Sequence, residues 1–174
     1  GRAAYDPAFG AYTVGATSFD DDGQTYDAIG GEAGVRVYPV RGLDLYLNYA
    51  FENVELRENS PNAALYDDQR TPQHKINAGV QVRTSFGLDL SLDFHFVDAQ
   101  RWRERIIDVA RGGVAFFSFD LPAYTQLNAR IGYRLLDDRL DLGIVGTNLT
   151  GEHREHPFGQ PTQVTIVGTA GLRF

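Results

Sequence analysis

Apolar and polar residues alternate along most of the chain with a period of two. In residues 43–51 every odd position is Leu, Tyr or Phe, whereas the even positions are Asp44, Tyr46, Asn48 and Ala50. Because successive side chains of a strand point to opposite faces, this pattern predicts a strand with one apolar and one mostly polar face. Equally strong alternation marks 76–82, 88–96, 127–135, 140–144 and 164–174, with no charge at any apolar-face position. Weaker alternation at 28–38 and 9–18 brings the total to eight predicted strands.

The connections between these segments alternate between short and long. Residues 39–42, 84–87 and 136–139 predict tight turns, whereas 19–27, 53–74, 98–123 and 150–162 are long and polar and predict loops. Short turns on one side and long loops on the other are typical of outer-membrane barrels, where the short turns are periplasmic. The first strand would then run outward, and both termini would lie on the periplasmic side.

The fold class depends on which face meets water. A soluble barrel turns its apolar face inward, and a soluble sandwich buries it between two sheets. A membrane barrel turns it outward and needs an apolar belt without charges, because a charge near the bilayer midplane costs about 2–4 kcal/mol. The uniform Leu, Ile, Val, Phe and Tyr face favours the membrane barrel. We therefore predict an all-β, antiparallel, up-and-down transmembrane β-barrel of eight strands, with residues 1–174 as a single domain that contains no plug.

Composition and charge exclude several classes of protein, site and partner. The chain has no Cys, a net charge of −7 and a mean hydropathy of −0.30, and no apolar run approaches the ~18 residues of a spanning helix. A helical membrane protein, a disulfide framework and a thiol nucleophile are thereby excluded. The acidic charge disfavours nucleic acid as a partner. The expected partners are outer-membrane lipid or a detergent that replaces it.

Charges of both signs occupy the polar face. In an eight-stranded barrel the interior is just wide enough for side chains, so we expect these residues to form a salt-bridged network without a pore. Asp89 and Asp93 could also be an acid–base pair, but no substrate pocket accompanies them. The predicted lumen charge network is Glu32, Arg36, Asp44, Lys75, Arg83, Asp89, Asp93, Arg130, Arg134 and Asp141.

The longest predicted loop holds the candidate ligand-binding residues Arg101, Trp102, Arg103 and Arg105, with phenylalanines nearby. Trp102 is the only tryptophan of the chain. Its ring could stack on a ligand, or it could anchor the barrel in the outer leaflet while the arginines meet lipid phosphates. The sequence leaves both interpretations open.

No metal, cofactor or catalytic site is predicted. His153 and His156 lack the spacing of a zinc-helix motif, and the acidic run 20–22 with Asp27 does not match a calcium-binding EF-hand. Both are interpreted as solvated loops. Residues 148–150 match a glycosylation sequon but stand at a strand end. The chain shows no nucleophile elbow or phosphate-binding loop, and we expect no enzymatic activity.

The chain ends in Gly171-Leu172-Arg173-Phe174, an apolar strand that closes on an aromatic residue. This ending resembles the signal by which outer-membrane barrels are recognised by the barrel-assembly machinery. Gly171, Leu172 and Phe174 are the residues that carry the resemblance.

Several segments resemble the end of a TonB-dependent outer-membrane receptor. Residues 124–133 resemble its third-last strand, 140–151 its penultimate strand with an Asn-Leu-Thr ending, 153–159 the start of the following loop and 164–174 the closing strand. Residues 71–80 resemble the Pro-x-His segment that opens an inner strand. The resemblance implies a bacterial outer-membrane location and, for the parent family, a plugged barrel of about 22 strands, TonB as partner and energised uptake of siderophores or other nutrients.

Two functions follow. The resemblance implies that the chain is the C-terminal barrel segment of such a receptor, with TonB as a partner only of the full receptor. The alternative is a self-contained small eight-stranded barrel with a structural or surface-binding role and no open pore.

Overall fold

The computed structural model describes all residues except 1–2, 7–10, 15–25, 57–68 and 109–112. The predicted all-β, antiparallel character is confirmed, since the described residues contain strands and no helix. The strands are β1 (Ala3–Asp6), β2 (Ala11–Val14), β3 (Tyr26–Val37), β4 (Leu43–Leu56), β5 (His74–Arg83), β6 (Leu88–Val97), β7 (Gln100–Asp108), β8 (Gly113–Leu121), β9 (Tyr124–Leu135), β10 (Leu140–Thr147) and β11 (Thr165–Leu172).

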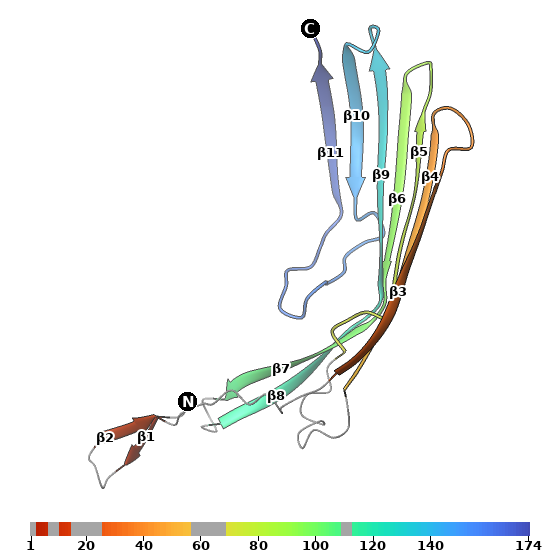
Figure 1. Ribbon diagram of the computed structural model, residues 1–174. Coiled ribbons are helices and arrows are strands. Elements are labelled where there is room, and N and C mark those ends of the chain that lie inside the picture. Colours follow the sequence, from red (N-terminus) through yellow and green to blue (C-terminus); the bar gives the residue numbers. More distant parts are fainter. Residues whose placement is uncertain (1–2, 7–10, 15–25, 57–68, 109–112) are drawn as a thin grey trace.

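A seven-stranded sheet dominates the structure (Figure 1). Its order is β11-β10-β9-β6-β5-β4-β3, and every neighbouring pair is antiparallel. The predicted up-and-down order is therefore confirmed for the seven strands from β3 onward that belong to this sheet. Strand β3 forms one edge and β11 the other, and within the described residues no ladder joins these two edges.

The register keeps the alternation in phase from strand to strand. One row of paired residues runs Val35, Leu47, Ala78, Phe94, Leu127 across five strands. The next row runs Asn48, Asn77, His95 and Gln126 across four. Because a slip of one residue would exchange the faces of a strand, this register collects apolar side chains on one face of the sheet and polar side chains on the other.

The three predicted tight turns join the strands where expected. Gly42 and Gly87 adopt φ values of 85° and 102°, which an L side chain rarely adopts, and a Cβ at Gly87 would stand 2.4 Å from the carbonyl oxygen of Arg134. In the turn 136–139, Leu136, Asp137 and Asp138 all have positive φ. The three turns lie at one end of the sheet, here called the turn end, and the long connections lie at the opposite loop end (Figure 1).

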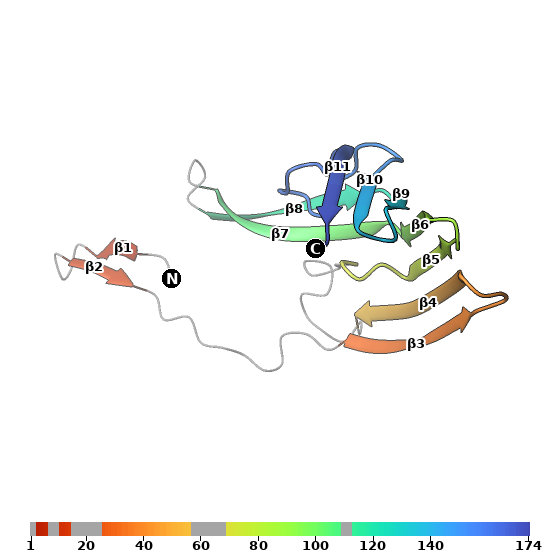
Figure 2. The same cartoon turned by 90° about the horizontal axis from the view of Figure 1, so that it is seen from above.

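The sheet is curved, and its seven strands follow an arc that is open on one side (Figure 2). The connection from β10 to β11 lies on the concave side (Figure 1). His153 of this connection stacks on Tyr124, and Tyr124 shares its face of β9 with Gln126, Asn128 and Arg130. The polar face is therefore concave and the apolar face convex.

No layer covers the convex face within the described residues. Val97 and Leu121 are the only buried hydrophobic residues there, and neither lies in a row of the apolar face. Large apolar side chains of the convex face are instead exposed, including Val35, Ile131 and Ile144 at 50–55%. The described part of the chain also holds no helix long and apolar enough to cross a membrane.

The prediction of a loop over residues 98–123 is wrong for most of that segment. Residues 100–108 and 113–121 form the antiparallel hairpin β7–β8, in which Gln100 pairs with Leu121. This hairpin continues β6 and β9, whose last pair is Val97 with Tyr124, after interruptions at 98–99 and 122–123. It bends away from the sheet toward the concave side (Figure 1).

The predicted first strand, 9–18, also differs from the structure. Within it, β2 covers residues 11–14 and pairs with β1, which the sequence pattern did not predict. Residues 9, 10 and 15–18 lie outside the described residues, as do 19–25 of the first predicted loop. The main sheet therefore contains seven of the eight predicted strands, and β2 is not one of them.

Candidate functional site

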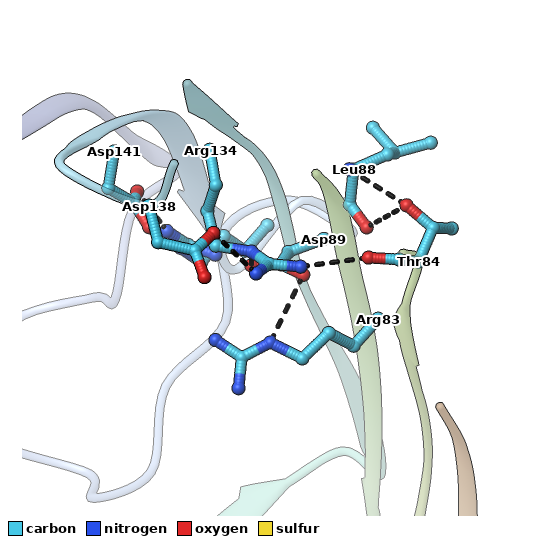
Figure 3. Close-up of polar contacts among 8 residues, drawn as sticks. Arg83, Thr84, Leu88, Asp89, Arg134, Asp138 and Asp141 are labelled. Carbon is cyan, nitrogen blue, oxygen red and sulfur yellow. Dashed lines mark hydrogen bonds and ion pairs between the residues drawn. The ribbon is translucent and has the colours of Figure 1, made fainter. Parts of the chain in front are cut away.

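The concave face carries an ion-pair network at the turn end. Arg134 on β9 is its centre: Nε donates to Asp89 Oδ2 on β6 at 3.0 Å, and Nη1 donates to Asp138 Oδ1 at 2.7 Å. Arg83 Nε stands 3.5 Å from the other oxygen of Asp89. The side chains of Arg134 and Asp89 are 15% and 13% exposed, so the central pair is largely screened from solvent. Figure 3 shows Arg134 lying between the two aspartates.

The same arginine ties a turn to the sheet. Its Nη2 donates to the carbonyl oxygen of Thr84 at 2.8 Å, and its backbone N–H donates to the carbonyl oxygen of Gly87 at 2.8 Å. Thr84 in turn exchanges two hydrogen bonds with the backbone of Leu88 through its hydroxyl. Arg134 thus fixes the 84–87 turn against β9 as well as neutralising Asp89 (Figure 3).

Three further pairs continue along this face. Arg130 Nη2 donates to Asp141 Oδ1 at 2.8 Å between β9 and β10, and Arg36 Nε donates to Asp44 Oδ1 at 3.0 Å between β3 and β4. The hydroxyl of Tyr46 donates to Asp93 Oδ1 at 2.6 Å, across the intervening Gly79.

The ten residues predicted as a lumen charge network all lie on strands β3 to β10 and share this face by register. The structure brings seven of them into ion pairs with one another, and Asp93 bonds to Tyr46. Glu32 and Lys75 make no ion pair within the described residues and flank Ala50 in one row.

Aromatic residues gather at the loop end. On β7 of the bent hairpin, the ring of Trp102 contacts the Arg70 guanidinium, 4.9 Å from the ring centroid, and the His156 ring, whose centroid is 4.5 Å away in an edge-to-face arrangement. Arg70 also pairs with Glu104 at 3.2 Å. Phe158 packs edge-on against Phe119 of β8 at 5.0 Å. We call these residues of three chain segments the loop-end cluster.

The β10–β11 connection is fixed to the concave face beside this cluster. His153 stacks on Tyr124 at 4.1 Å between ring centroids. Asn148 is 1% exposed and donates two hydrogen bonds that hold this connection in place. Its backbone N–H donates to Asn128 Oδ1, and its Nδ2 donates to the carbonyl oxygen of Thr162. The connection therefore folds over β9 and carries His156 and Phe158 to the hairpin.

The four candidate ligand-binding residues stand on β7 and face alternate sides. Trp102 faces the loop-end cluster, whereas Arg101 pairs with Asp120 at 2.8 Å and the guanidinium of Arg103 lies over the Phe116 ring. Arg105 is opposite Phe116 in the register, and its side chain lies outside the described residues. The Trp102 ring has the Arg70 guanidinium over it and contacts the His156 ring edge-to-face, which makes Trp102 a packing residue in this conformation.

The remaining predicted positions are placed as follows. His153 stacks on Tyr124, whereas His156 contacts Trp102. The described residues contain no group of three or more His, Asp or Glu side chains that could hold a metal. Asp27 lies on β3, whereas residues 20–22 lie outside the described residues. Gly171 and Leu172 belong to the exposed edge strand β11, and Phe174 is fully exposed beyond it.

Sequence reasoning missed the partners that make the cluster. The role of Arg70 gave no sequence signal, because its contacts join segments more than thirty positions apart. The Tyr46–Asp93 bond had one sequence signal: Tyr46 is a large side chain on a polar face, and Gly79 leaves room for it on the strand between the two residues.

Comparison with known proteins does not assign the chain to a family. No family model matches the chain, and no curated protein matches it either.

Replacement of Arg134 by Met is expected to destabilise the sheet more than replacement of Arg36 by Met. The first change removes the donor to Asp89, Asp138 and Thr84 in a largely screened position, whereas the side chain of Arg36 is 52% exposed and has Asp44 as its one hydrogen-bond acceptor among the described residues. Urea unfolding followed by circular dichroism should give a lower midpoint for R134M. Equal midpoints would show that the network does not hold the turn end.

Replacement of Trp102 by Ala is expected to release the β10–β11 connection. The ring is the contact between His156 and the hairpin, so amide hydrogen exchange in 152–160 should accelerate while exchange in β5 and β6 stays unchanged. Phe117→Ala, on the same hairpin but 48% exposed, is the control. Unchanged exchange in W102A would contradict the role of Trp102 as a packing residue.

Proposed function

We propose that this chain forms part of the wall of a β-barrel in the bacterial outer membrane, as the C-terminal barrel segment of a TonB-dependent receptor. The observation that carries the proposal is the uncovered convex face, where large apolar residues on six of the seven strands of one register are exposed. Monomeric soluble proteins rarely expose contiguous apolar patches beyond a few hundred Å². Lipid acyl chains are apolar, so they can cover such a face without the cost of exposing it to water.

The direction of curvature supports a membrane barrel over a soluble one. A soluble ligand-carrying barrel needs its apolar face on the concave side, around the ligand. Here the concave side carries the ion pairs of Arg134, Arg130 and Arg36, and the apolar side is convex.

Strand direction limits how the wall can close. Six antiparallel steps separate β3 from β11, so the two edge strands run in the same direction. Joining them directly, or joining two copies that share one orientation in the membrane, would create a parallel pair. An antiparallel barrel therefore needs an odd number of additional strands between β11 and β3.

Both barrels considered from the sequence meet this condition. One additional strand gives the small eight-stranded barrel, and about fifteen give the barrel size of the receptor family. The predicted strand 9–18 would supply the single strand, but its described part, β2, pairs with β1. This pairing supports the receptor segment over the self-contained barrel. In the receptor, nutrient uptake, TonB and the barrel-assembly machinery would be partners of the whole protein.

Refolding of residues 1–174 tests this proposal. We expect the chain to need detergent or lipid, to give a β-rich circular dichroism spectrum and to migrate identically in boiled and unboiled samples on an SDS gel. An open sheet has no closed ladder to resist SDS. A heat-modifiable band would favour the closed eight-stranded barrel, and solubility without detergent would overturn the membrane proposal.

A charge on the convex face is expected to prevent insertion. Leu92→Lys places an ammonium group in the middle of the apolar face, at a cost of about 2–4 kcal/mol near the bilayer midplane. Gln81→Lys introduces the same charge on the concave face and is the matched control. Flotation with lipid vesicles should recover Q81K like the unaltered chain and L92K in much lower yield. Equal recovery would contradict the orientation proposed for the sheet.

A further inference from the structure

A pocket of about 310 Å³ lies over β3, β4 and β5, the strands at one end of the arc in Figure 2. Most of its lining belongs to the concave face, because these residues share the register rows of the polar side chains. They are Ala28, Gly30, Glu32, Ala50, Glu52 and Lys75. The two alanines and the glycine are small, so they leave space between the charged side chains around them.

The charged residues of this pocket differ from all others on the concave face. Every other Asp, Glu, Lys or Arg that the seven strands place on this face has an ion pair or, for Asp93, a bond to Tyr46. Glu32, Glu52 and Lys75 have no such partner within the described residues, and all three line the one pocket. The unsatisfied charge of the concave face is therefore collected at a single place.

The three charges form a triangle beside Ala50. Glu32 and Lys75 lie opposite Ala50 on its two neighbouring strands, so about 10 Å separates their Cα atoms. Glu52 is two positions further along β4 and is a diagonal neighbour of both, at about 7–8 Å. Glu32 and Glu52 are exposed, and Lys75 is half-buried. A small molecule that lies over Ala50 can therefore reach all three groups at once.

We propose that this pocket binds a free basic amino acid, such as L-lysine. Two carboxylates and one ammonium group complement a ligand with two cationic groups and one carboxylate. Lys75 and Glu52 hold the ligand's α-carboxylate and α-ammonium groups, which are adjacent, and Glu32 holds the cation at the far end of its side chain. Each contact is a hydrogen bond between charged groups, the stronger class of hydrogen bond.

The positive charge of Lys75 distinguishes this ligand from a metal ion. A metal ion would gain from the two glutamates but would be repelled by the ammonium group, and no group of three metal-binding side chains is present among the described residues. The site goes beyond the proposed function, because it depends on the concave face alone and not on what covers the convex face.

A titration with L-lysine tests the site. The chain 1–174 is labelled with ¹⁵N and refolded in detergent micelles, and its backbone amide signals are followed by NMR. We expect saturable shifts in 28–32 and 50–52 and none in β9 and β10. L-Norleucine lacks the side-chain ammonium group and cadaverine lacks the carboxylate. Each should bind about three- to fivefold more weakly, the effect of losing one exposed ion pair.

Variants assign the contacts. Glu32→Gln should weaken binding of L-lysine about three- to fivefold and leave binding of L-norleucine unchanged, because Glu32 contacts only the side-chain cation. Glu55→Gln removes the same charge from β4 outside the pocket lining and is the matched control. Ala50→Leu fills the centre of the site without changing its charge and should weaken binding of both ligands.

The absence of saturable shifts with L-lysine, or shifts confined to strands outside the pocket, would overturn the site. Equal weakening by E32Q and E55Q would reveal a general effect of charge and overturn the contact of Glu32. Unchanged affinity in A50L would overturn the position of the ligand over Ala50. Solubility of the chain without detergent would overturn the membrane proposal alone, and the same titration would then be made in buffer.

Discussion

The register of seven antiparallel strands is the constraint on which the rest of the structure depends. A slip by one position in β6 would turn Asp93 to the convex face and Phe94 to the concave face. The ion pairs oppose such slips, because Arg134 reaches Asp89 on one neighbour and Asp138 in the following turn only when β6, β9 and β10 are correctly aligned. The apolar pattern and the charged network therefore specify the same alignment independently.

The two ends of the sheet are stabilised by different interactions. At the turn end, short connections leave little room for side chains other than those of the strands, and arginines bind carboxylates and turn carbonyls. At the loop end, the β10–β11 connection folds back over the concave side and packs through rings, as His153 does on Tyr124 and His156 on Trp102. In the proposed membrane location these ends face two different compartments.

The strands of the main sheet were predictable because their two faces differ along most of their length. The hairpin β7–β8 was not predicted, although Arg101, Arg103 and Arg105 alternate with Trp102, Glu104 and Ile106. Neither face of that hairpin is uniformly apolar, so alternation there does not stand out from a polar loop. Strand β1 is four residues long and too short for a periodic signal. The loop-end cluster was unpredictable for another reason: the contact of Arg70 with Trp102 depends on where two long connections meet in space.

The curvature of the main sheet also left a trace in the sequence. Bending a sheet crowds the side chains on its concave side, and small residues there leave room for large ones. A Cβ at Gly79 would stand 2.3 Å from the ring of Tyr46, and a Cβ at Gly132 would stand 2.7 Å from the guanidinium of Arg130. Both glycines occupy polar-face positions, so Tyr46 can lie over Gly79 of the neighbouring strand and Arg130 over Gly132 of its own strand, and the two side chains reach Asp93 and Asp141. Glycines within the polar set thus favour a sheet that is concave on its polar side, and in the proposed membrane location that direction turns the apolar side toward lipid.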